Sequence, residues 1–259
     1  MIRITVANQK GGVGKTTTAI NLGTAMAAIG WRVLIIDLDP QGNASTGLGI
    51  PVSDRVRSTY DVLMGEERAV DCAIPTKVPR LSIIPATVDL SGAEIQLVEV
   101  EARAQRLTRA LDSATDQWDV CLIDCPPSLG LLTINALVAA QSLLVPLQCE
   151  FFALEGLSQL LKTYEQIRER FNPGLSILGV ALTMYDRRNR LTEQVADDVR
   201  SCLGASVFET VIPRNVRLSE APSHGLPALI YDHRCPGSEA YMALAREVIG
   251  RLPALRIAA

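Results

Sequence analysis

The sequence contains no run of eighteen apolar residues, the length that a helix needs to cross the hydrocarbon core of a bilayer. Met1 leads directly into a strand-like run, without the basic and apolar regions of a signal peptide. We therefore expect neither a membrane-spanning segment nor export, and we predict a cytoplasmic protein without a membrane partner.

The six cysteines include no C-x-x-C pair, the spacing that is typical of zinc sites and redox-active dithiols. Cys121, Cys125 and Cys149 lie in or beside apolar, strand-like runs. In a cytoplasmic protein such cysteines are expected to be reduced. The sequence therefore favours buried, unpaired thiols over a disulfide framework or a cysteine-based metal site.

A strong basic excess is also lacking, because the formal net charge is −3. This charge gives no reason by itself to expect a nucleic-acid partner. The arginines of the second half nevertheless cluster at two places, which are Arg187, Arg188 and Arg190, and Arg214 and Arg217. Such clusters are compatible with a local basic patch on an acidic protein.

The chain fits one large α/β domain over residues 1–259, since 48% of its residues are hydrophobic and it contains no repeat or linker. Strand-like runs occur at 2–7, 32–37, 81–85, 120–124, 142–146, 178–183 and 207–212. Helical patterns occur at 16–29, 91–113, 131–140, 153–170, 191–203 and 238–251. This alternation predicts a mostly parallel twisted sheet with helices on both faces.

A glycine-rich segment between the first strand and the first helix predicts a phosphate-binding loop. It consists of Lys10, Gly11, Gly12, Val13, Gly14, Lys15, Thr16 and Thr17. Backbone N–H groups and the positive end of the helix dipole converge there, and glycines let a polyphosphate approach closely. We expect Lys15 to reach the β and γ phosphates, Thr16 to bind Mg²⁺ and Thr17 to donate to phosphate.

Three acidic residues end strand-like runs, and ligands in such sheets bind at the carboxyl ends of the strands. Asp39 is the candidate for orienting or deprotonating an attacking water, and Asp37 for holding the metal's water shell. Capping of the next turn, or pairing with a surface arginine, is the alternative for both. Asp124 closes the hydrophobic run 120–124 and is expected near Mg²⁺, as in a Walker B motif.

Segments 8–19, 37–43, 124–127, 146–151 and 212–225 together resemble the chromosomal ParA/Soj partition ATPases, a deviant Walker A group within the MinD/ParA superfamily of P-loop proteins. The resemblance runs from residue 3 to about residue 245. It implies that Lys10 contacts the nucleotide of a second subunit in an ATP-bound sandwich dimer, in which Gly11 leaves room at the dimer contact. It also implies that Asp39 positions the water and that Pro213 and Asn215 form the adenine-side wall.

The same resemblance implies that the ATP-bound homodimer binds nonspecific DNA of the nucleoid. A ParB-like centromere-binding protein would stimulate hydrolysis and release the dimer, which drives chromosome or plasmid segregation. The arginines in the corresponding segments are Arg187, Arg188, Arg190, Arg214, Arg217 and Arg246, with a position facing the nucleotide as the alternative for Arg214. Neutralising a DNA backbone needs several such cations together. We expect no sequence-specific operator binding, because no helix-turn-helix segment precedes the first strand.

The main alternative is a MinD-like membrane-associated ATPase, which shares the phosphate loop but needs a basic amphipathic terminal helix. The tail 247–259 contains Pro253, and its cations are Arg251 and Arg256, which predicts a poor lipid anchor.

A second alternative is an iron–sulfur carrier of the nitrogenase-reductase type, for which Cys121 and Cys125 offer no suitable further cysteine. A non-enzymatic scaffold is the third, and it is disfavoured by the joint presence of the residues predicted for hydrolysis.

Overall fold

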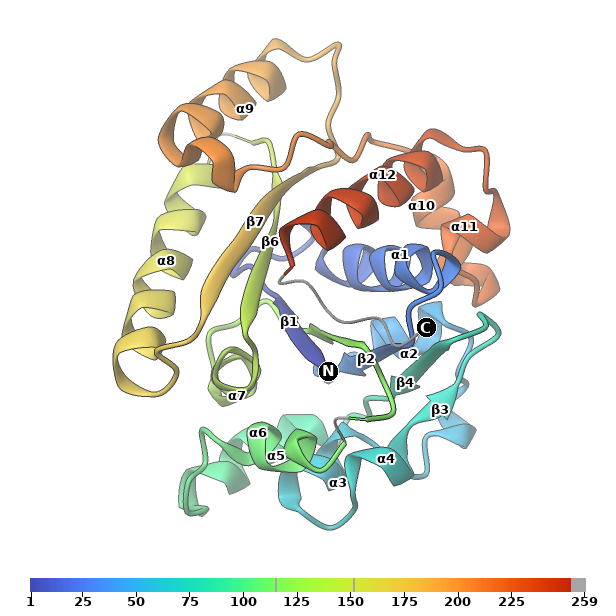
Figure 1. Ribbon diagram of the computed structural model, residues 1–259, viewed down its shortest axis with the longest axis vertical. Helices are drawn as coiled ribbons and strands as arrows, with labels where there is room; N and C mark the ends of the chain where they lie inside the picture. The colour runs from blue at the N-terminus through green and yellow to red at the C-terminus, as the bar shows by residue number, and fades with distance from the viewer. Residues whose placement is uncertain (115, 151, 253–259) are drawn as a thin grey trace.

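The computed structural model describes residues 1–114, 116–150 and 152–252, and it contains a seven-stranded sheet of order β3-β4-β2-β5-β1-β6-β7 (Figure 1). The strands are β1 (Ile2–Val6), β2 (Val33–Asp37), β3 (Ile74–Pro75), β4 (Leu81–Ile84), β5 (Val120–Asp124), β6 (Ser142–Gln148) and β7 (Ser176–Thr183). Neighbouring strands are parallel except for the short edge strand β3, which runs antiparallel to β4.

The helices are α1 (Lys15–Ala28), α2 (Asn43–Gly47), α3 (Thr59–Met64), α4 (Ala69–Cys72), α5 (Leu90–Gln96), α6 (Arg106–Asp112), α7 (Leu131–Ala139), α8 (Ala153–Arg170), α9 (Arg190–Leu203), α10 (Val216–Glu220), α11 (Ala228–Tyr231) and α12 (Pro236–Arg251). Short 3₁₀ turns are η1 (Val52–Asp54), η2 (Leu97–Glu99), η3 (Gly204–Ser206) and η4 (Ala221–His224). No helix within the described ranges is long and apolar enough to span a bilayer.

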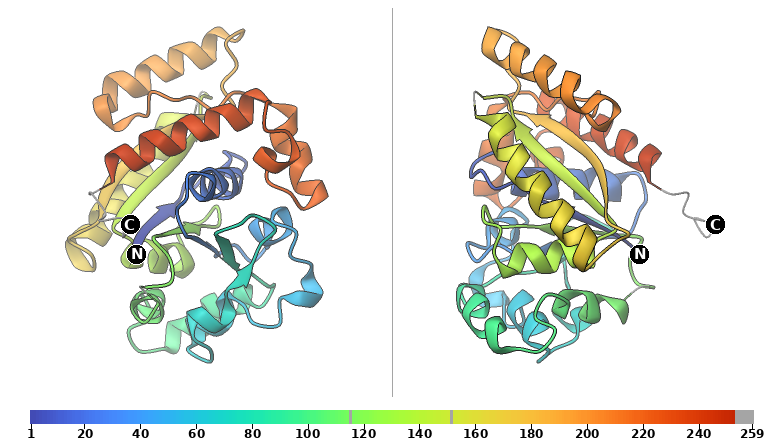
Figure 2. Two further views of the ribbon diagram at one scale, coloured as in Figure 1. Left: turned by 45° about the vertical axis from the view of Figure 1, so that its right-hand side comes forward. Right: turned by 90° about the vertical axis from the view of Figure 1, so that its left-hand side faces the viewer.

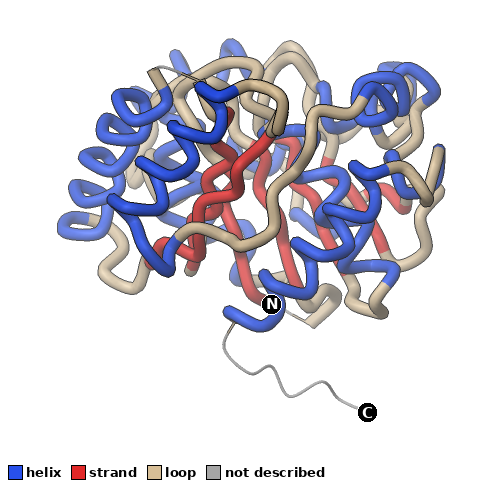
Figure 3. The backbone as a smooth tube through the Cα atoms, turned by 90° about the horizontal axis from the view of Figure 1, so that it is seen from above, coloured by secondary structure: helices blue, strands red, loops and turns tan. Residues whose placement is uncertain are grey.

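Two hydrophobic cores lie on opposite faces of the sheet, because alternate side chains of each strand point in opposite directions. On β2, Leu34 and Ile36 pack into one core, whereas Val33 and Ile35 pack into the other. Helices α1 and α12 cover the second face, and α6, α7 and α8 cover the first, with α8 lying across β6 (Figure 2). Seen from above, helices flank the strands on both sides (Figure 3). The prediction of a mostly parallel sheet with helices on both faces is confirmed.

The expected strand at 207–212 is wrong. The segment touches β7 at its two ends, where Phe208 N donates to Val180 O (2.9 Å) and Ile212 N donates to Leu182 O (2.8 Å). Between these points, the backbone N–H groups of Glu209 and Thr210 donate to the Glu247 carboxylate instead. A side chain of α12 therefore takes the bonds that would have extended the sheet.

The expected helix 91–113 is divided into α5, η2 and α6. Val100 is extended and Ala102 adopts a left-handed conformation with φ 53°, which ends the helical path. The apolar periodicity continues through this break, so the sequence pattern did not reveal it. The short helices α2, α3, α4, α10 and α11 were also not predicted, since each is too brief to show a clear period.

Candidate active site

The site lies where β1, β5 and β2 end side by side. Val6 at the end of β1 pairs with Asp124 at the end of β5, and Asp124 pairs with Asp37 at the end of β2. The glycine loop leaves β1 at this edge, and α1 begins at Lys15. The strand register therefore brings the predicted phosphate loop and the predicted acids to one point of the sheet.

The loop backbone is open toward solvent and anchored from below. Gly12 and Gly14 have φ values of 75° and 88°, in the left-handed region that favours glycine. Apart from its chain neighbours, no described residue would come within 4 Å of a Cβ atom at Gly12, and the same holds at Gly11. The carbonyl of Val13 accepts a hydrogen bond from the buried Thr183 hydroxyl (2.8 Å). The exposed glycine backbone is thus held in place from β7, as a cradle for an anion requires.

Lys15 lies at the base of this cradle, where its Nζ donates to the carbonyl of Lys10 (3.1 Å). The lysine is buried, and burial lowers the pKa of its ammonium group, while the nearby Asp124 and Asp39 oppose that change. With one carbonyl partner in the described part of the chain, this buried ammonium group retains two further N–H donors. Lys15 is therefore suited to bind an anionic ligand.

Asp124 is fully buried, and both of its carboxylate oxygens lack a hydrogen-bond partner among the residues that the structure describes. Burial, followed by the charge of Asp37, raises the pKa of Asp124 well above its usual value. The Thr16 hydroxyl lies close enough to oppose this rise without meeting the geometry of a hydrogen bond. Such an unpartnered carboxylate beside a hydroxyl fits a hydrated magnesium ion.

Asp37 is also fully buried, but its oxygens have partners. Oδ2 accepts hydrogen bonds from the Ser45 backbone N (2.8 Å) and hydroxyl (2.6 Å), and Oδ1 accepts one from Asp39 N (3.3 Å). Burial raises the pKa of Asp37 to about 6. The turn-stabilising role considered as an alternative for Asp37 is thus present in the structure.

Asp39 lies on the same turn and is 7% exposed, with Oδ1 accepting a hydrogen bond from Gln41 N (3.0 Å). It is close enough to Lys15 to influence the pKa of that ammonium group. The structure therefore brings Asp39, Lys15 and Asp124 together, as predicted from the sequence.

No group of three or more His, Cys, Asp or Glu side chains in the described ranges could hold a metal ion, so a magnesium ion here would need ligands from phosphate and water as well.

Lys10 forms an ion pair across the mouth of the loop, with its Nζ 2.5 Å from Oε2 of Glu150. The two side chains are 37% and 47% exposed. The contact was not predicted from the sequence, because 140 residues separate the pair. Only the three-dimensional proximity of the loop to the end of β6 reveals it.

A cavity of about 470 Å³ adjoins the glycine loop, and its lining includes Gly14, Thr17, Met184, Pro213 and Asn215. The residues predicted to face a base therefore lie beside those predicted to face phosphate. The Asn215 side chain also caps α10, since its Oδ1 accepts a hydrogen bond from the backbone N of the second following residue (3.1 Å).

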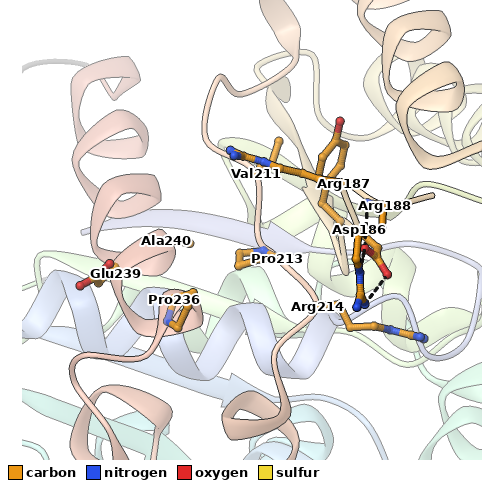
Figure 4. Close-up of a pocket in the computed structure, with 10 residues that line it drawn as sticks. Asp186, Arg187, Arg188, Val211, Pro213, Arg214, Pro236, Glu239 and Ala240 are labelled. Atoms are coloured by element: carbon orange, nitrogen blue, oxygen red, sulfur yellow. Dashed lines mark hydrogen bonds and ion pairs between the residues drawn. The ribbon is translucent and has the colours of Figure 1, made fainter. Parts of the chain in front are cut away.

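The predicted arginines divide into two sets. Arg187, Arg188 and Arg214 line an open cleft of about 610 Å³ between the end of β7 and α12 (Figure 4). Arg188 is paired with Asp186 at 3.0 Å. The remaining three are not part of the cleft lining: Arg190 begins α9, Arg217 pairs with Glu220 and Asp232, and Arg246 is exposed on α12.

Comparison with known proteins is consistent with this site. A family model described as an AAA domain matches residues 1–177. The chain is 61% identical over 250 residues to the chromosome partitioning protein ParA of Caulobacter vibrioides, covering 96% of this chain and 94% of the relative. It is 54% identical over 245 residues to the sporulation initiation inhibitor protein Soj of Bacillus subtilis, covering 95% of this chain and 97% of the relative.

Two solved structures share the fold. Cobyrinic acid a,c-diamide synthase of Mycobacterium smegmatis, with bound ADP and magnesium, has a TM-score of 0.84 at 37% identity and covers 95% of this chain and 93% of its own. The cell division ATPase MinD of Pyrococcus furiosus has a TM-score of 0.81 at 28% identity, covering 97% and 99%. From the extent and identity of these matches, the chain belongs to the ParA/Soj family of chromosome-partitioning ATPases.

Proposed function

We propose that this partitioning ATPase binds ATP with Mg²⁺, forms a nucleotide sandwich dimer on nonspecific DNA, and leaves the DNA when a ParB-like partner stimulates hydrolysis. The observation that best supports this proposal is the pair of lysines in one exposed glycine loop, with Lys15 buried at its base and Lys10 half-exposed at its mouth. We place this cycle in the cytoplasm, on the nucleoid. Its cargo would be a chromosome or a plasmid.

The cradle fits a magnesium–nucleotide complex. Lys15 and the backbone N–H groups at the start of α1 would hold the phosphates, with Thr17 as a further donor. Thr16 and Asp124 would hold the hydrated metal, which neutralises charge on the phosphate oxygens when it is bound. The nucleotide and magnesium in the Mycobacterium smegmatis structure support this assignment.

Lys10 would bind the nucleotide phosphates of the second subunit. To reach across, its ammonium group must leave Glu150, and both groups are exposed enough for solvent to screen the ion pair. Exposed pairs of this kind contribute about 0–1 kcal/mol, so the lysine is readily released. A triphosphate on the facing subunit offers more charge than one carboxylate, which would couple dimer formation to the presence of the γ-phosphate.

The first test is Lys15→Ala. Removing a buried ammonium group that pairs with phosphate is expected to cost about 2–5 kcal/mol of binding free energy and to abolish nucleotide retention. Isothermal titration with ATP and Mg²⁺ measures this loss. The exposed Lys77→Ala is the matched control and should bind as the wild type does. ATP affinity unchanged in Lys15→Ala would refute the loop assignment.

The second test concerns DNA. Within the described residues, neither Arg187 nor Arg214 forms a side-chain ion pair, so both are available to phosphate. We expect Arg187→Ala combined with Arg214→Ala to weaken binding to duplexes of any sequence and to reduce the salt slope by about one per lost phosphate contact. Adding Arg188→Ala and Arg190→Ala should reduce it further.

The control for the DNA test is Arg32→Ala. Arg32 directly precedes β2, at the amino ends of the strands, and its side chain pairs with Asp119. Titrations with ATP at several salt concentrations give the slopes. A slope equal to that of the wild type in the combined variant would place the DNA surface elsewhere on the molecule.

The MinD-like alternative is separated by parallel co-sedimentation with anionic liposomes and with duplex DNA, each in ATP. The C-terminal tail 247–259, whose composition predicts a poor lipid anchor, lies partly at 253–259, outside the described residues.

For the iron–sulfur alternative, Cys121 and Cys125 are both fully buried, away from any surface that a second subunit could share. Iron analysis of the purified protein tests it.

A further inference from the structure

Arg55 follows η1 and is buried, with a side chain that turns back toward the segment after Asp39. Its Nε and Nη2 donate to the carbonyl of Ile50 (3.2 and 2.8 Å), and Nη2 also donates to the Thr46 hydroxyl (2.8 Å). Nη1 donates to the carbonyl of Ala86 (3.1 Å) and more weakly to that of Gly42 (3.5 Å). One guanidinium group thus joins α2, both of its flanking turns and the segment after β4.

The local backbone is shaped around this side chain. Gly42 has a φ of 62°, and a Cβ atom at that position would collide with Nη1 of Arg55. A planar guanidinium group with five fixed donors can satisfy several carbonyls at once, which an ammonium group cannot do in the same geometry. The acceptors of Arg55 are neutral oxygens, so its buried charge is directed at the backbone of this turn.

The turn that Arg55 holds also carries Asp39. Gly42 N donates to the carbonyl of Asp39 (2.9 Å), and Ser45 at the start of α2 donates twice to Asp37. The turn is therefore fixed at its β2 end by Asp37 and from the opposite side by Arg55. A residue that orients water must be held within a fraction of an ångström to act.

We propose that Arg55 is a positioning residue for ATP hydrolysis, which acts by fixing the turn that presents Asp39. This inference rests on the proposed role of Asp39 and extends it to a side chain outside the nucleotide cradle. Among the residues that the structure describes, none of the Arg55 hydrogen bonds reaches the glycine loop or Lys15. The effect of its loss should therefore fall on the chemical step and leave nucleotide binding nearly unchanged.

The experiment compares steady-state hydrolysis by Arg55→Ala, Arg55→Lys and Arg57→Ala. Because a displacement of about 1 Å can lower a rate about 100-fold, we expect kcat of Arg55→Ala to fall by about 10- to 100-fold, with KM for ATP within about twofold of the wild type. The kcat of Arg55→Lys should lie between the kcat of the wild type and that of Arg55→Ala. Arg57 is an exposed neighbour paired with Glu67 (3.1 Å), and its alanine variant should keep the wild-type kcat.

Two further readouts distinguish positioning from general loss of stability. If Arg55 acts through Asp39, the double variant Arg55→Ala/Asp39→Ala should be no slower than Asp39→Ala alone. Guanidinium ion added to Arg55→Ala should restore part of kcat. A double variant that is slower by the full product of the two effects would overturn the inference, as would a kcat loss matched by an equal rise in KM.

Should Arg55→Ala not fold, Arg55→Lys carries the test, and an unchanged kcat in that variant overturns the inference. Separate outcomes contradict the role of Asp39 and the role of Arg55. If Asp39→Ala hydrolyses ATP normally, the proposed role of Asp39 is wrong. If Asp39→Ala is inactive while Arg55→Ala turns over at the rate of Arg57→Ala, the inference about Arg55 alone is wrong.

Discussion

Asp39→Ala is expected to bind ATP and remain as a long-lived dimer on DNA, with hydrolysis reduced about 10²- to 10⁴-fold, the usual contribution of a positioned acid or base. The reason is that Asp39 lies beside the cradle without forming part of it, on the turn after β2. Its loss removes the group that would orient water and leaves unchanged Lys15 and Lys10, the two lysines proposed to hold phosphate. Phosphate release and light scattering with ATP, ADP or no nucleotide measure the three properties together.

The matched control for that variant is Asp54→Ala, which removes an exposed carboxylate from η1 at the same end of the sheet. It should hydrolyse ATP as the wild type does. Normal phosphate release by Asp39→Ala would remove Asp39 from catalysis. Loss of hydrolysis without a stable dimer would instead contradict the proposed sandwich arrangement and with it the proposed role of Lys10.

The sequence was most informative where the residues of the candidate site are close together along the chain. The strand, glycine turn and helix that place Lys15 are consecutive, so the motif contains the geometry. Asp37 and Asp124 were predictable for a related reason: each ends an apolar run, and parallel strands finish at one edge. What spacing could not decide was how each acid is used, since Ser45 binds Asp37, whereas Asp124 has no such partner within the described ranges.

Contacts between distant segments were not predictable from one sequence. Glu150 approaches Lys10 because β6 lies next to β1, and the two residues share no motif. Arg55 is part of a polar stretch that resembles an ordinary surface loop, yet its side chain is buried. The failed strand at 207–212 has the same origin, because the decisive acceptor, Glu247, comes from α12.

Asp124→Asn should change stability and activity in opposite directions. The Asp124 carboxylate is buried without a hydrogen-bond partner in the described part of the chain, which disfavours its ionised form. A neutral amide of nearly equal volume should raise the free energy of unfolding at pH 7.5 by about 1–3 kcal/mol. The same change removes a predicted metal-holding charge, so Mg²⁺-dependent hydrolysis should fall by about 10- to 100-fold.

The pH dependence of the free energy of unfolding shows whether the buried Asp124 carboxylate causes this difference in stability. A carboxyl group whose pKa is raised in the folded state holds its proton more tightly there than in the unfolded chain, so stability falls as pH rises between the two pKa values. Asp37, with a pKa of about 6, gives such a fall between about pH 4 and pH 6 in both proteins. Above pH 6 the fall should continue in the wild type and be absent from Asp124→Asn. Urea unfolding without nucleotide or Mg²⁺ measures it, with the exposed Asp198→Asn as control. Parallel curves for wild type and Asp124→Asn above pH 6 would show that this carboxylate is stabilised without a metal ion, and would contradict its assignment to metal binding.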